Sequence, residues 1–65
     1  MKQTVAIDSM KDVLVLDAGP TVEVHLRTYR VSAIQQPLTP DQAEAIANAL
    51  LRCAAAARAT LQARA

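Results

Sequence analysis

The chain has 65 residues, a formal net charge of +1 at pH 7, one cysteine, one histidine and one aromatic residue. A single cysteine excludes a disulfide within the chain, and one histidine with one cysteine are too few for a tetrahedral metal site. The low net charge gives no indication of a nucleic-acid or membrane-surface partner, and no apolar run approaches the ~18 residues of a membrane span.

The chain is small for an independent fold. A domain of this size buries only about 60% of the surface that its unfolded form exposes. The sequence is 52% hydrophobic, but it contains no Trp or Phe, and much of its apolar content is alanine. Because alanine adds little volume to a core, we expect one domain over residues 1–65 that is completed by other copies of the chain, as a homodimer or higher symmetric oligomer.

Segments rich in β-branched residues predict strands in the N-terminal half, at about residues 3–8, 12–17 and 21–34. The Asp8–Ser9 pair favours a turn between the first two segments, and the Gly19–Pro20 pair favours a turn between the second and third. The third segment contains no Gly, Pro or Asn, so we expect it to run unbroken.

Two arrangements of these strands stay open. The first is a three-stranded meander, which the Asp-Ser turn favours, and the second is one long hairpin that is bulged near its middle. A three-residue loop over residues 18–20 would place Leu16 opposite Val22. In the meander, the long third segment would overhang its neighbour, and unpaired strand backbone invites pairing with another chain.

A long helix is predicted over about residues 40–63. Thr39 is a good N-cap, Pro40 suits the first helical position, and Gln42 stands at the spacing of a capping box. The segment is rich in alanine, the strongest helix former. The expected fold is therefore α+β: a small antiparallel sheet of two or three strands, followed by one long C-terminal helix that packs on one face of the sheet.

Successive ~100° steps around this helix separate two apolar surfaces. The main stripe consists of Ala43, Ile46, Leu50, Cys53, Ala57 and Leu61. On it, Cys53 is expected to be a buried, unreactive thiol. A neighbouring strip of small residues would suit close approach by a second helix, which only another copy could supply; it contains Ala45, Ala49 and Ala56.

Residues 22–30 alternate apolar and polar side chains, as expected for a strand with one face toward a core. We interpret the polar row, which includes His25 and Arg27, as a solvated face. Tyr29, Val31 and Ile7 form an apolar patch that we expect to contact a partner protein. Contact with nucleic acid through basic side chains is the alternative, and it would use Arg27, Arg30 and Arg58.

The sequence offers little for catalysis. Gly19 is the only glycine, so there is no Gly-rich phosphate loop, and Ser9 and Ser32 have no evident His–Asp partnership. We therefore expect no enzymatic activity, no cofactor and no metal site.

The function that these observations favour is that of a small protein-interaction module, a regulator or inhibitor that acts as a homo-oligomer on a larger protein. The alternative is a small dimeric regulator that binds nucleic acid. The lack of a secretion signal and the lone cysteine predict a cytoplasmic location. The alanine and arginine usage is typical of a bacterial or phage sequence.

Overall fold

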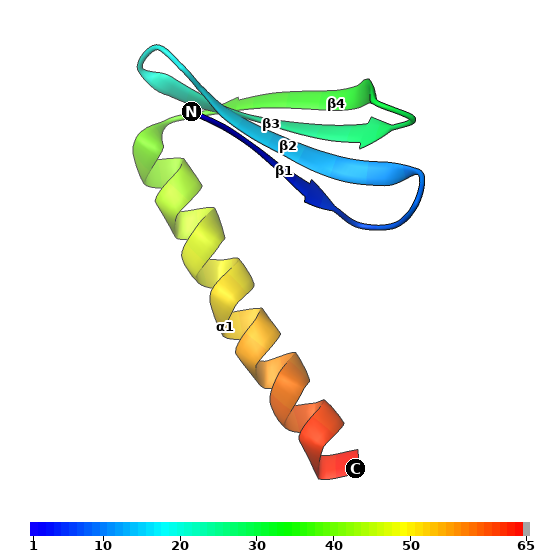
Figure 1. Ribbon diagram of the computed structural model, residues 1–65. Coiled ribbons are helices and arrows are strands. Elements are labelled where there is room, and N and C mark those ends of the chain that lie inside the picture. The colour runs from blue at the N-terminus through cyan, green and yellow to red at the C-terminus, as the bar shows by residue number, and fades with distance from the viewer. Residues whose placement is uncertain (65) are drawn as a thin grey trace.

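The computed structural model describes residues 1–64, which form a four-stranded sheet followed by one helix (Figure 1). The elements are β1 (Lys2–Ala6), β2 (Lys11–Ala18), β3 (Thr21–Thr28), β4 (Val31–Leu38) and α1 (Pro40–Arg64). Each strand pairs antiparallel with the next, in the order β1-β2-β3-β4. The expected α+β class and C-terminal helix are confirmed, whereas the expectation of two or three strands is wrong.

The fourth strand arises because the segment expected to run unbroken over residues 21–34 turns in its middle. Tyr29 and Arg30 adopt positive φ values of 53° and 63°, and Thr28 pairs with Val31 across them. Two central residues with positive φ make a type I′ turn, whose twist matches that of the flanking strands. Such turns favour Asn-Gly, so the Tyr-Arg pair carries no sequence signal for the break.

The β2–β3 hairpin is also tighter than expected. Gly19, with φ of 62°, and Pro20 form a two-residue turn, and Ala18 pairs with Thr21. Glycine with positive φ at the first central position is typical of a type II′ turn. The expected three-residue loop is therefore wrong, and Leu16 lies opposite Glu23 rather than Val22.

The β1–β2 turn is held by the carboxylate of Asp8. Its Oδ1 accepts hydrogen bonds from the backbone N–H groups of Met10 and Lys11, each at 2.8 Å. These two bonds, aided by the charge of Lys11, lower the pKa of Asp8 below its usual value of 3.8. The turn agrees with the meander, the arrangement that the Asp-Ser pair favours.

We expect the fold to lose stability in acid as Asp8 takes up a proton. Because its pKa is depressed on folding, its contribution is fully present above the unfolded pKa and is lost as pH falls through the lower folded pKa. The N-terminal ammonium lowers the pKa of Asp17 and adds to the same trend. Thermal melts between about pH 5 and pH 2 should show a falling midpoint. Asp8→Ala should reduce the fall, and Ser9→Ala in the same turn should not; equal slopes would contradict the assignment.

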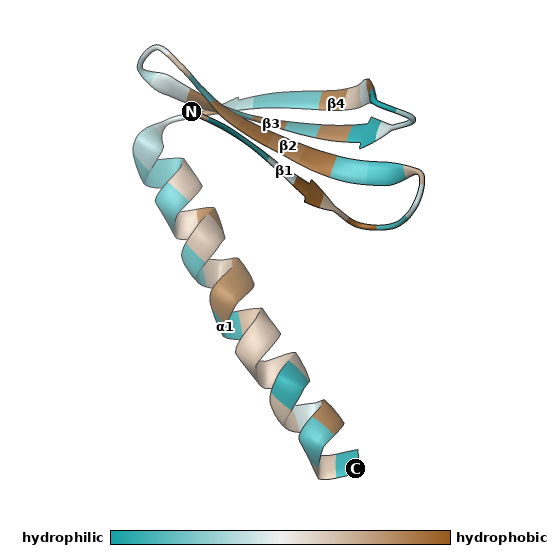
Figure 2. Cartoon of the chain, viewed as in Figure 1, coloured by the Kyte–Doolittle hydropathy of each residue, from teal (hydrophilic) through white to brown (hydrophobic). Residues whose placement is uncertain are grey.

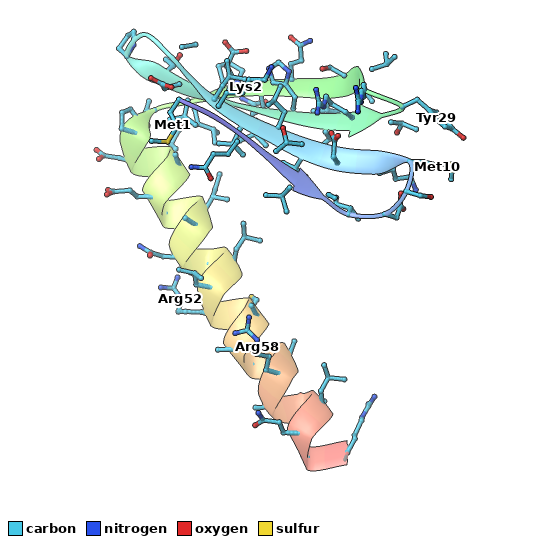
Figure 3. The ribbon with its side chains drawn as sticks, viewed as in Figure 1. Met1, Lys2, Met10, Tyr29, Arg52 and Arg58 are labelled. Atoms are coloured by element: carbon cyan, nitrogen blue, oxygen red, sulfur yellow. The ribbon has the colours of Figure 1, made fainter. Side chains whose placement is uncertain are left out.

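The register gives the sheet two chemically different faces, because directly paired residues share a face. The apolar face carries Val5, Val13, Val15, Val22, Val24, Leu26, Val31 and Ile34. The polar face carries Lys2, Thr4, Asp12, Leu14, Leu16, Glu23, His25, Arg27 and Ser32. In Figure 3, Lys2 lies on the side of the sheet away from the helix, so the apolar face looks toward the helix.

The helix does not cover the apolar face within its own chain. It contacts β3 and β4 where it starts and then runs away from the sheet (Figure 1), and no residue from Pro40 to Arg64 is buried. The expected packing of the helix on the sheet is therefore wrong for the single chain. Among residues 1–64 the only buried hydrophobic side chain is Leu14, which is 7% exposed.

The helix begins directly after the sheet, and its first turn is capped. One residue, Thr39, separates β4 from α1. Its N–H donates to Gln42 Oε1 at 3.0 Å, and the Gln42 N–H donates to Thr39 Oγ1 at 3.1 Å, which completes the expected capping box. Pro40 takes the first helical position, where its restricted φ suits the helix.

Candidate functional site

The polar face carries an ion pair between neighbouring strands. Arg27 donates from Nε to Asp12 Oδ1 at 2.6 Å and from Nη2 to Asp12 Oδ2 at 2.9 Å. The side chains are only 15% and 20% exposed, and the hydrogen bond to Asp12 raises the pKa of the Arg27 guanidinium further. A bidentate pair of this kind fixes both side chains, so Arg27, which was a candidate for nucleic-acid contact, is already occupied.

A second polar group adjoins this pair. His25 Nε2 lies 3.0 Å from Glu23 Oε1, and His25 Nδ1 lies 3.2 Å from Ser32 Oγ. The His25 side chain is only 14% exposed. This row forms the polar face opposite the apolar one, as expected, but its side chains bond to one another instead of extending into solvent. Ser32 does contact the histidine, a partnership that depends on the β3–β4 register.

Ser32, His25 and Glu23 are linked in the order of a serine–histidine–acid nucleophilic triad. Their surroundings, however, differ from those of an acyl-transfer site. Such a site needs a substrate cavity with donors placed for a developing oxyanion. Ser32, His25 and Glu23 line none of the three grooves described for residues 1–64. Across residues 1–64 there is also no group of three or more His, Cys, Asp and Glu side chains that could hold a metal ion.

A different cluster forms at the end of the sheet opposite the helix, where the β1–β2 and β3–β4 turns meet (Figure 3). The Tyr29 N–H donates to the Met10 carbonyl at 2.8 Å, and the Tyr29 hydroxyl donates to Met10 Sδ. A groove of about 360 Å³ lies between the turns. We call its prominent side chains the turn cluster: Met10, Lys11, Tyr29 and Arg30.

The turn cluster combines strain with exposure. Left-handed backbone costs a non-glycine residue about 1–2 kcal/mol, and Tyr29 and Arg30 both adopt it. Tyr29 is nevertheless 70% exposed, so burial in the chain does little to offset that cost. Tyr and Arg are among the residues most enriched in the energetic centres of protein interfaces. Backbone strain of this kind clusters at functional sites in proteins.

Relieving this strain should stabilise the fold. Arg30→Gly is expected to raise the free energy of unfolding by about 1 kcal/mol, because glycine adopts positive φ without steric cost. Adding Tyr29→Asn should raise it further, since Asn-Gly is the preferred type I′ pair. Urea denaturation followed by circular dichroism measures both changes. Gly19→Ala provides the reverse control, since a side chain at φ of 62° should destabilise. If Arg30→Gly is less stable than the wild type, the backbone of this turn is not strained.

The structure separates the predicted interface residues into two regions. Tyr29, Val31 and Ile7 lie at the turn end of the sheet, and their residues are 70%, 68% and 63% exposed. The alanine strip is exposed on the helix, away from these three residues. It consists of Ala45, Ala49 and Ala56.

The other basic candidates are also apart, because Arg30 lies in the β3–β4 turn and Arg58 lies far along α1. Met10 and Lys11 were not predicted from the sequence as site residues. The sequence feature that could have indicated Met10 is an apolar residue inside a predicted polar turn.

Apolar side chains of the sheet and of the helix are exposed in the single chain. Val5, Leu26 and Ile34 on the apolar face are 59%, 43% and 55% exposed. On the helix, the main stripe is exposed from Ile46 onward, with Leu50 and Leu61 each 65% exposed. Cys53 on this stripe is exposed as well, so its expected burial is wrong for the single chain, because no other element reaches this part of the helix. Figure 2 shows hydrophobic stretches in all four strands and in the middle of α1.

No helix within residues 1–64 combines the length and the apolar character needed to cross a membrane. Comparison of the chain with models of known protein families, with curated proteins and with solved structures finds no match.

Proposed function

We propose that this chain is a non-enzymatic protein-interaction module, a regulator or inhibitor that works as a homo-oligomer and binds a larger protein through the turn cluster. The observation that supports this proposal most is the Tyr29–Arg30 turn, which holds two exposed side chains on strained backbone. Ile7 and Val31 lie at the same end of the sheet and add apolar surface at the rim.

The chemistry of the turn cluster suits a protein partner. Tyr29 offers a large apolar ring with a hydroxyl, Arg30 offers a planar donor, and Met10 is a flexible thioether that adapts to irregular surfaces. The adjoining groove of about 360 Å³ can receive a side chain of the partner. Asp12 and Arg27 line a groove of about 190 Å³, but each is held by the other in a bidentate ion pair.

The test compares capture of a partner by the wild-type protein and by the Tyr29→Asn/Arg30→Gly double variant. The double variant is expected to be more stable than the wild type, so a lost partner cannot be attributed to unfolding. A tagged wild-type chain, crosslinked in its host, should enrich a defined protein that mass spectrometry identifies. The double variant should lose that protein, and Arg58→Gln, which removes a charge elsewhere, should keep it. Equal capture by all three would contradict the proposed surface.

A small dimeric regulator that binds nucleic acid is the second candidate. It is supported by Arg30 and Arg58, which form no ion pair within residues 1–64. Against it, Arg27 is neutralised by Asp12. Fluorescence anisotropy with labelled single- and double-stranded DNA tests it. Binding at low salt that weakens steeply with added salt, and weakens with Arg58→Gln, would favour this candidate, and no binding at low salt would remove it.

A further inference from the structure

The apolar face and the helix stripe are complementary surfaces that the chain cannot join by itself. A sheet with one apolar face must bury it against another layer, and α1 is the only element outside the sheet in the described residues. Beyond its first turns, that helix runs away from the sheet of its own chain (Figure 1). Within one chain, the apolar face therefore has no helix to cover it, and the helix stripe has no sheet to pack on.

The exposed area is large enough for a stable dimer. The chain has an accessible surface of 5296 Å², whereas a compact monomer of this mass has about 4000 Å². The excess of about 1300 Å² per chain amounts to about 2600 Å² for two chains, within the range of obligate dimers. The radius of gyration of 14.1 Å likewise exceeds the about 11 Å of a compact chain of this length.

The dimensions of the two surfaces also agree. The stripe from Ile46 to Leu61 is about 22 Å long at the helical rise. The eight-residue strands β2 and β3 are about 27 Å long. A groove of about 400 Å³ opens on the apolar side near the start of the helix, with Val15 and Val22 among its lining residues. A helix laid along the strands would reach this groove and cover its half-buried valines.

We infer that the partner of the apolar face is a second copy of this chain, whose α1 lies across it. A two-fold axis then places the helix of each copy on the sheet of the other. The same contact occurs twice, and together the two contacts cover the apolar face and the stripe of both copies. This inference rests on the proposed homo-oligomer and specifies how its copies meet. The alanine strip then faces outward, in contrast to a dimer in which Ala45 and Ala49 bring two helices together.

The native Cys53 provides a probe of this arrangement, because it lies on the stripe and is the only cysteine. We would introduce a second cysteine on the apolar face, as Val5→Cys, Val15→Cys or Leu26→Cys in separate variants. Thr4→Cys is the matched control, since it is next to Val5 on β1 but on the polar face. Each variant is checked for mass and fold by light scattering and circular dichroism, then treated with a short bismaleimide.

We expect crosslinked dimers that join Cys53 to the introduced cysteine on the apolar face, identified by peptide mass spectrometry. The control should give at least ten-fold less of this product. If the chain is multimeric but links mainly Cys53 to Cys53, and none of the three apolar-face variants crosslinks to Cys53, the inference is overturned while the proposed homo-oligomer stands. If the wild-type chain is monomeric, the homo-oligomer fails as well.

Discussion

Replacing Leu50 with aspartate is expected to dissociate the protein into monomers. Leu50 is 65% exposed in the single chain, near the middle of the helix stripe, and in the proposed dimer it would be buried on the partner's sheet. The substitution removes about 2 kcal/mol of apolar burial and places a carboxylate in the interface. Together these should weaken association by at least about 3 kcal/mol, or roughly 100-fold in the dissociation constant.

The matched control is Asn48→Asp, which introduces the same carboxylate two residues away on the polar side of the helix. It should leave the association unchanged. Sedimentation velocity over a dilution series measures both variants beside the wild type. If Leu50→Asp sediments like the wild type, or if both variants dissociate equally, the stripe is not the interface.

The second large effect is expected at Leu14, the buried residue of the sheet. Truncation of a buried leucine to alanine costs about 2–5 kcal/mol, and a domain this small rarely has more than about 3–5 kcal/mol of stability. Leu14→Ala should therefore unfold most of the protein at room temperature. Far-ultraviolet circular dichroism and thermal melts measure the loss of sheet and helix signal.

Leu16→Ala is the appropriate comparison, because Leu16 lies on the same strand and the same face but is only half-buried. We expect it to fold with a lower melting temperature. If Leu14→Ala is as stable as Leu16→Ala, the two leucines are equally buried in solution. That result would contradict the assignment of Leu14 as the core residue of the sheet.

The helix could be predicted from the sequence because its signals are local. Thr39, Pro40 and Gln42 define its start within four positions, and the structure places the helix at Pro40–Arg64. Its position relative to the sheet could not be predicted in the same way. The apolar stripe indicates that the helix must be covered, but it does not say whether the covering sheet belongs to the same chain.

The strands were harder to predict because turns without their preferred residues give no signal. Tyr29 and Arg30 hold a turn that normally uses Asn and Gly, so the break between β3 and β4 was not visible. At Gly19 the turn was visible, but its length was not, and an error of one residue changed every pair between β2 and β3.

That one-residue error also concealed the polar network. In the expected register Asp12 would lie opposite Leu26, whereas in the structure it lies opposite Arg27 and forms a bidentate ion pair. An alternating polar row looks solvated in a sequence, because its cross-strand partners depend on the register. The turn cluster was missed in part for the same reason, since contact between Met10 and Tyr29 requires both turns to meet at one end of the sheet.

The most direct test is the mass of the wild-type protein in solution, measured by light scattering during size-exclusion chromatography at micromolar concentration. We expect twice the 6.9 kDa mass of the chain, or a larger even multiple, with sheet and helix signals that decrease together on dilution. A folded species of 6.9 kDa whose circular dichroism is independent of concentration would contradict the proposal that a second copy completes this fold.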